Sequence, residues 1–161
     1  MPIQFVSGDP TLTRAQTLAF SHNARGRIEL GPLQTALARN YPAAFSSYTR
    51  RCRSGHITAG AYWIWRESTP MLAFLVVRES SVGATRLRHV QHIALTLARD
   101  YRLENIRSLA IAPLGTAGEE TEIRKVLHTW FSRARFPVIV YETYQPGIQA
   151  EETLLDTNSA M

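Results

Sequence analysis

The sequence lacks the features that mark several classes of protein. Cys52 is the only cysteine among 161 residues, so no disulfide can form within the chain. The longest apolar run, Met71 to Val77, is far shorter than the roughly 20 residues that a membrane-spanning helix needs, and the first residues do not have the layout of a secretory signal. We therefore expect a cytoplasmic protein that makes no contact with a membrane.

Motifs for common cofactors and hydrolases are absent as well. The chain has no G-x-G-x-x-G dinucleotide motif, no G-x-x-x-x-G-K-[ST] phosphate loop and no G-x-S-x-G nucleophile turn. Its five histidines stand without a carboxylate or cysteine that completes a set of metal ligands. We expect neither a metal site nor a cofactor.

Lysine is nearly absent too, since Lys125 is the only one, yet the formal net charge is +5. Arginine therefore carries the positive charge, and a basic surface attracts polyanions. The densest group is Arg50, Arg51 and Arg53. We interpret this group as the solvated end of a helix, with a nucleic-acid contact as the alternative.

Segments typical of strands alternate with segments of helical periodicity. Strands are predicted near residues 3–7, 13–20, 61–65, 71–77, 108–112 and 137–141, and helices near 32–39, 42–53, 87–101 and 119–134. This alternation predicts an α/β fold, a three-layer α/β/α sandwich with a mixed, mostly parallel sheet. Residues 1–144 form the predicted domain. Residues 145–161 have little apolar periodicity and are predicted to be a loosely ordered tail.

The stretch from Ser108 to Glu122 contains the most informative turn. A buried strand ends there in a glycine-rich turn, from Pro113 to Gly118, that leads into a helix. Such a turn directs several backbone N–H groups at one point, and together with the helix dipole they favour an anion such as phosphate. Thr116 and Glu119 also have the spacing of a capping box, so the alternative is that the turn serves only to begin the helix.

Three features together resemble the macro-domain family. They are Gly8-Asp9 after the first strand, Asn23 in a glycine-containing loop after the second, and the turn from Pro113 to Gly118 after a late strand. Their order and spacing match over residues 3–143, most of all in the macro domains of DarG-type antitoxins that remove ADP-ribose from DNA. The resemblance implies ADP-ribose, or ADP-ribosylated DNA or protein, as the partner, and a cognate toxin as a further one.

The resemblance also implies roles for individual residues. Asp9 would accept a hydrogen bond from the adenine amino group, Asn23 would face the distal ribose, and residues 115–118 would wrap the diphosphate. Asn23 and Arg78 are the candidate catalytic residues. The candidate ligand-binding residues are Gly8, Asp9, Asn23, Gly26, Gly31, Pro113, Leu114, Gly115, Thr116, Ala117, Gly118 and Tyr141.

The chain departs from the family pattern at three single residues and in one short stretch. Pro10 has no backbone N–H to offer to the adenine ring, and Phe20 stands where the family has the first of two paired asparagines. The family's M-G-K-G stretch is replaced by residues 28–31, Ile-Glu-Leu-Gly. Arg78 stands in place of a catalytic lysine of the DNA-specific members, and arginine is too basic to carry a proton.

These matches and departures lead to three hypotheses. We favour a binding module for ADP-ribose, a related nucleotide or an ADP-ribosylated target, because the lysine is missing while Asp9, Asn23 and the late glycine turn are present. The second hypothesis is an ADP-ribosyl glycohydrolase that uses Asn23 and Arg78. The third is an interaction protein, such as an antitoxin, that has the fold without a ligand.

Overall fold

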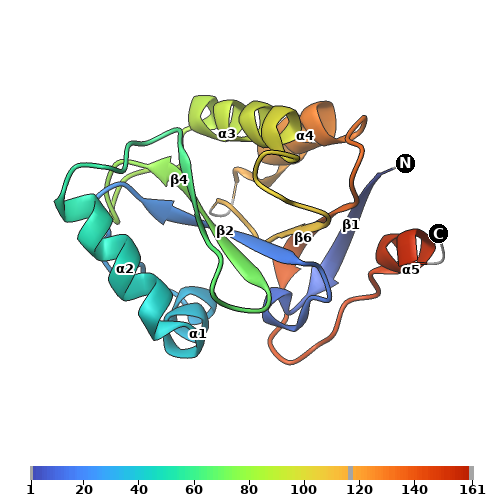
Figure 1. Ribbon diagram of the computed structural model, residues 1–161, viewed down its shortest axis with the longest axis horizontal. Helices are drawn as coiled ribbons and strands as arrows, with labels where there is room; N and C mark the ends of the chain where they lie inside the picture. The colour runs from blue at the N-terminus through green and yellow to red at the C-terminus, as the bar shows by residue number, and fades with distance from the viewer. Residues whose placement is uncertain (1, 116–117, 160–161) are drawn as a thin grey trace.

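A six-stranded sheet runs through the middle of the molecule, with helices on both of its faces (Figure 1). The computed structural model describes residues 2–115 and 118–159. All neighbouring strands are parallel except the last pair, β4 and β3. In sheet order the strands are β1 (Ile3–Gly8), β6 (Val138–Tyr144), β5 (Leu109–Ile111), β2 (Thr17–Asn23), β4 (Met71–Arg78) and β3 (Tyr62–Trp65).

The helices form the two outer layers. Figure 1 shows α3 and α4 side by side over one face of the sheet and α1 and α2 over the other, which confirms the predicted three-layer sandwich with a mixed, mostly parallel sheet. In the described part of the chain, no helix is long and apolar enough to cross a membrane. The elements outside the sheet are the 3-10 helix η1 (Pro10–Leu12), α1 (Pro32–Asn40), α2 (Pro42–Arg53), α3 (Leu87–Asp100), α4 (Glu120–Phe131) and α5 (Thr153–Ser159).

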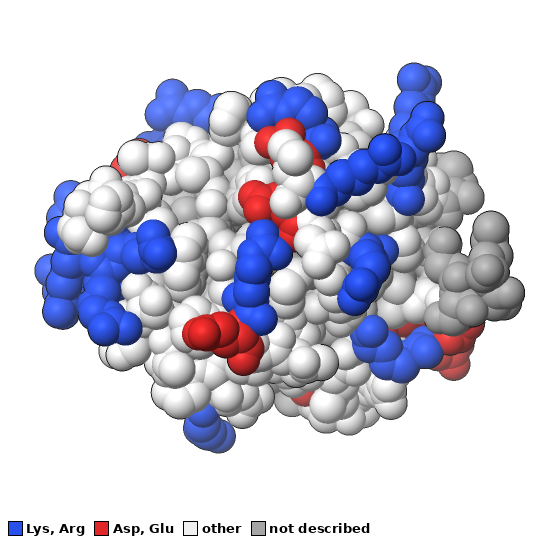
Figure 2. Space-filling view, viewed as in Figure 1, with Lys and Arg blue, Asp and Glu red and all other residues white. Residues whose placement is uncertain are grey.

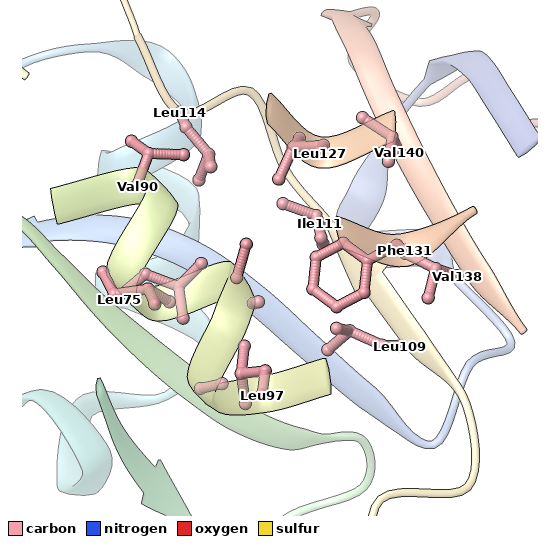
Figure 3. Close-up of a cluster of buried hydrophobic side chains, with 14 of the residues drawn as sticks. Leu75, Val90, Leu97, Leu109, Ile111, Leu114, Leu127, Phe131, Val138 and Val140 are labelled. Atoms are coloured by element: carbon pink, nitrogen blue, oxygen red, sulfur yellow. The ribbon is translucent and has the colours of Figure 1, made fainter. Parts of the chain in front are cut away.

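Successive residues of β4 face two different cores. Leu75 packs under α3 and α4 with Val90 and Leu127 (Figure 3), whereas Phe74 and Val76 pack against the side of α1 and α2. A strand that is buried on both faces is apolar at every position rather than at alternate ones. This explains why the run at 71–77 was identifiable from the sequence.

The first connection differs from the predicted one. Residues 13–20 were expected to be extended, but β2 begins only at Thr17. The carboxylate of Asp9 accepts a hydrogen bond from the backbone N–H of Thr11 at 3.0 Å, and this contact holds the chain in the η1 turn. After this turn, the backbone N–H groups of residues 14–16 donate to side chains rather than to a neighbouring strand, so pairing with the sheet starts later along the chain.

The C-terminal segment packs against the domain, in contrast with the predicted loose tail. Ala150 is buried, and Glu152 is only 1% exposed. The Glu152 carboxylate accepts hydrogen bonds from the backbone N–H of Arg14 at 2.9 Å, from the Tyr141 hydroxyl at 2.8 Å and from the Thr13 hydroxyl. A buried polar anchor, together with the apolar side chains of Ala150 and Leu155 in the core, thus holds this segment.

The arginines at the end of α2 are exposed. Arg50, Arg51 and Arg53 lie in the last turn of this helix, where positive charge interacts favourably with the helix dipole. Figure 2 shows basic side chains gathered at the left of the view, where Figure 1 places α2. Arg51 also lies over the ring of Trp63, 5.4 Å from its centroid. These contacts fit the interpretation as a helix end, and a nucleic-acid contact there remains a hypothesis.

His22 is a buried titratable residue on β2. It is 3% exposed and lies among the rings of Phe45, Tyr48 and Phe74. Its Nδ1 accepts the backbone N–H of Asn23 at 2.8 Å. Burial lowers the pKa of His22 from 6.5 to about 4. His22 therefore binds a proton near pH 6.5 in the unfolded chain but only near pH 4 in the folded protein. The neutral ring contributes to the stability of the fold above pH 6.5, and this contribution is lost as the pH falls from 6.5 to about 4.

Replacing His22 tests this linkage. Between pH 6.5 and pH 4 we expect the free energy of unfolding of the His22→Gln variant to fall less than that of the wild type, by about 3 kcal/mol. Glutamine keeps an acceptor for the Asn23 amide but has no proton to gain in this range. Urea unfolding at a series of pH values measures the difference, and equal losses in the two proteins would show that His22 is not the responsible group.

Candidate functional site

The sheet leaves a cleft where the order of its strands reverses. From its C-terminal end β2 leads to α1 on one face, whereas the neighbouring β5 leads to α4 on the other face. In open α/β sheets this divergence creates the crevice in which ligands bind. Here it contains a cleft of about 650 Å³, bordered by the ends of β2 and β4 and by loops that include Gly31, Gly83 and Gly115.

Arg78, the last residue of β4, connects the loops around the cleft. Its guanidinium forms a salt bridge with Glu29 and donates hydrogen bonds to the Thr85 hydroxyl at 2.8 Å and to the Leu114 carbonyl at 3.3 Å. The Thr85 hydroxyl donates to the same carbonyl at 3.1 Å. The side chains of Arg78 and Glu29 are 9% and 8% exposed. Each bordering loop therefore supplies one partner to this guanidinium.

Asn23, the last residue of β2, is completely buried and bonded within the chain. Its Nδ2 donates to the carbonyl of Arg27 at 2.9 Å and to Oε2 of Glu29 at 2.7 Å. Its Oδ1 accepts the backbone N–H groups of Arg25 and Arg27, each at 3.1 Å. Asn23 thus shapes the loop between β2 and α1, and it meets Arg78 through the carboxylate of Glu29.

Glu29 is a site residue that sequence reasoning missed. One of its oxygens accepts from Arg78 and the other from Asn23. Burial raises the pKa of the Glu29 carboxyl above its usual value, although the Asn23 hydrogen bond and the Arg78 charge act in the opposite direction. The sequence identified Glu29 only as an acidic replacement in a glycine-rich stretch. Its pairing with Arg78, 49 positions away, has no local signal.

Asp9, at the end of β1, has its polar groups engaged by the chain itself. One carboxylate oxygen accepts from the Thr11 N–H at 3.0 Å and the Thr11 hydroxyl at 2.6 Å, and the other accepts from the Gly147 N–H at 2.9 Å. The N–H of Asp9 donates to the Ile148 carbonyl at 2.6 Å. Three of the roughly four acceptor positions of this carboxylate are thus used within the chain, which leaves one, on Oδ2, for an adenine amino group.

The glycines named as candidates have different surroundings. Gly31 and Gly115 border the cleft. At Gly8 the φ angle is +155°, and a Cβ would lie 2.8 Å from the Ile148 carbonyl oxygen, so this glycine makes room for the C-terminal segment. Gly26 packs against α2, where a Cβ would lie 3.1 Å from the backbone of Thr49. The structure therefore brings only two of these four glycines to the cleft.

The late turn connects the cleft to the core. Pro113 borders the cleft, and Leu114 is buried among the residues under α3 and α4. Gly118 has a φ angle of +95°, and its N–H donates to the carboxylate of Glu120 at 2.8 Å. One amide of the predicted anion-binding turn is thus bonded to a carboxylate of the protein. The two remaining candidates, Thr116 and Ala117, lie outside the described residues.

Two tyrosines of β6 take different positions. Tyr141, the predicted ligand residue, is 1% exposed, and burial together with its hydrogen bond to Glu152 raises the pKa of its phenol. It borders a second cavity of about 270 Å³ beside α4. Tyr144, three residues later, borders the main cleft. The aromatic side chain available to a ligand there is that of Tyr144.

Solved macrodomains share this fold. The macrodomain of Thermus aquaticus DarG is similar with a TM-score of 0.78 and 17% identity, over 89% of this chain and 98% of that one. For the macrodomain of Mycobacterium tuberculosis DarG the TM-score is 0.78 and the identity 22%, over 90% and 98%. Thermosipho africanus DarTG in complex with ADP-ribose gives a TM-score of 0.80 and 18% identity, over 95% of this chain and 44% of that one. No family model and no curated protein matches the sequence.

The chain therefore has the macro-domain fold, as the sequence predicts. At these identities the similarity concerns the backbone arrangement. The residues of the cleft have to be interpreted from their own contacts.

Alanine substitutions at two glycines test the packing of the C-terminal segment. Gly8→Ala places a Cβ against the Ile148 carbonyl, whereas Gly147→Ala, also at a positive φ of +76°, has no atom within 4 Å of its new Cβ. We expect Gly8→Ala to lower the free energy of unfolding by about 1–2 kcal/mol more than Gly147→Ala does, because only the first adds a clash to the backbone strain. Urea denaturation of the two variants measures this difference, and equal losses would contradict the assigned contact.

Proposed function

We propose that this chain binds ADP-ribose, or a related nucleotide with a ribose and a phosphate, in the cleft between the ends of β2 and β5. The observation that carries the proposal is the position of the cleft at the strand-order reversal of a macro-domain fold. In support, a solved protein of similar fold, Thermosipho africanus DarTG, is in complex with ADP-ribose.

The cleft has the size and chemistry that such a ligand requires. Small-molecule sites occupy roughly 300–1,000 Å³, and this cleft has about 650 Å³. Tyr144 offers an aromatic face to a base, and Arg78 brings a positive charge close to where a phosphate would lie. Gly115 also borders the cleft, where the space beside its Cα is filled by the side chains of Glu119 and Ile123.

Binding without cleavage fits the residues at the strand ends. A general acid or base must exchange a proton near neutral pH, and the guanidinium of Arg78 does not. Arg78 is held by three partners, and the side-chain amide of Asn23 makes four hydrogen bonds within the chain. These two candidate catalytic residues are therefore better suited to shape a site than to transfer a proton.

A second candidate function is contact with a protein partner, such as a cognate toxin, in the absence of a nucleotide. Asp9 favours it, because both of its carboxylate oxygens and its backbone N–H are already bonded within the chain. In that case the toxin copurifies with the protein, and substitutions in the cleft have no effect on the complex.

Calorimetric titration with ADP-ribose tests the proposed function. We expect saturable binding near micromolar, which corresponds to about −8 kcal/mol. Ala84→Glu, at an exposed position that borders the cleft, should weaken binding by about tenfold or more, because it brings a carboxylate close to the diphosphate. Ser46→Glu adds the same charge to an exposed position of α2 and serves as the control. A wild type that does not bind would favour the contact protein.

A turnover assay separates binding from cleavage. We expect the protein to release no ADP-ribose from ADP-ribosylated DNA or protein, since Arg78 supplies no proton carrier. The release of labelled ADP-ribose over time measures the activity. Release by the wild type that is lost in Asn23→Ala would contradict the binding module and support the glycohydrolase.

A further inference from the structure

A carboxylate of the chain itself accepts hydrogen bonds from two buried donors, Arg78, which borders the cleft, and Asn23, which is paired with it at the end of the neighbouring strand. The two oxygens of Glu29 accept separate hydrogen bonds, one from the Arg78 guanidinium and the other from Nδ2 of Asn23 at 2.7 Å. Arg78 is 7% exposed and Asn23 is completely buried. A guanidinium and an amide that converge on a pair of oxygens form an anion site, and phosphate oxygens suit the same donors. We call Arg78 and Asn23 the anion cradle.

Little else holds the segment that brings Glu29 to the cradle. The side chains on either side, Ile28 and Leu30, are 86% and 95% exposed. Among the described residues, the backbone groups of residues 28–30 form no hydrogen bond. Gly31, which follows, has a φ angle of +132° and no atom within 4 Å of an added Cβ. The segment is thus anchored through one side chain and has open space at its end.

The two donors are far better fixed than the carboxylate. Asn23 and Arg78 are paired as the final residues of the parallel strands β2 and β4, just after a shift in their register. Arg78 also bonds to Thr85 and Leu114, and Asn23 also bonds to the loop backbone, so neither donor is held by Glu29 alone. A buried guanidinium without an anion is costly, so a departing carboxylate has to be replaced by another anion.

We propose that Glu29 is an internal substitute for an anionic group of the ligand. A phosphate that enters the cleft displaces the Glu29 carboxylate from Arg78 and Asn23, and residues 28–30 move away with it. One anion replaces another, so the charge of the cradle stays balanced. The statement that a nucleotide makes this exchange rests on the proposed function. The statement that the anion cradle binds inorganic phosphate does not.

Thermal unfolding of Glu29→Gln in inorganic phosphate tests the proposal. This variant keeps the size of the side chain but leaves Arg78 without an anion, so we expect a lower melting temperature than in the wild type. Phosphate at millimolar concentration should raise the melting temperature of the variant by about 3 °C or more beyond any rise in the wild type. Glu67→Gln, which removes a charge from an exposed position, controls for net charge.

The double variant Glu29→Gln/Arg78→Gln controls for the general stabilisation of folded proteins by phosphate. A rise that is confined to Glu29→Gln and absent from the double variant supports the cradle. Equal rises in the wild type, in Glu67→Gln or in the double variant overturn it. If Glu29→Gln does not fold, the amide NMR signals of residues 28–30 in the wild type give a second test. They should shift with phosphate more than that of Gly55, and unchanged signals overturn the proposal.

Titration of the same proteins with ADP-ribose separates this proposal from the proposed function. If phosphate stabilises Glu29→Gln selectively while ADP-ribose binds neither protein, the cradle stands and the proposed function fails. If ADP-ribose binds both proteins equally and phosphate has no selective effect, the proposed function stands and the cradle fails. If both are right, ADP-ribose binds Glu29→Gln about tenfold or more tightly than the wild type, because no internal carboxylate competes.

Discussion

The buried guanidinium of Arg78 is the interaction on which the shape of the cleft depends. Its place follows from the pairing of β2 with β4, in which a shift of register after His22 places Arg78 opposite Asn23 at the strand ends. The three loops that follow β2, β4 and β5 then reach it through Glu29, Thr85 and the Leu114 carbonyl. Removing one partner of such a buried pair costs about 3–5 kcal/mol, because the other charge is left uncompensated. Arg78 is therefore a structural residue of the cleft as well as a positive charge within it.

The polar groups at the ends of β1, β2 and β4 are bonded within the chain itself. At one end the C-terminal segment and the η1 turn use the carboxylate of Asp9, and at the other end Glu29 uses Arg78 and Asn23. A ligand that contacts these groups exchanges existing hydrogen bonds for new ones, so its affinity is the difference between the two sets. For the proposed ligand, these internal contacts would therefore determine how tightly it is held.

Local sequence patterns predicted the strands and helices of the three-layer fold. The features that they did not predict depend on contacts between residues far apart in the sequence. The apolar run of β4 and the helical spacing of α3 are properties of neighbouring residues, and both elements lie close to their predicted positions. The packed C-terminal segment depends on Glu152, whose partner Thr13 lies 139 positions away. Tyr144 rather than Tyr141 borders the cleft. The pairing of β1 with β6 shifts its register just before the strand ends, and the alternation of residues along a strand does not predict such a shift.

A crystal structure of the protein with ADP-ribose tests the central claim most directly. The account predicts the ligand in the cleft between β2 and β5, with phosphate oxygens within hydrogen-bond distance of Arg78 and Asn23 and with the Glu29 carboxylate displaced from both. A ligand bound elsewhere on the molecule, or one bound in the cleft while the salt bridge between Glu29 and Arg78 stays intact, would contradict it.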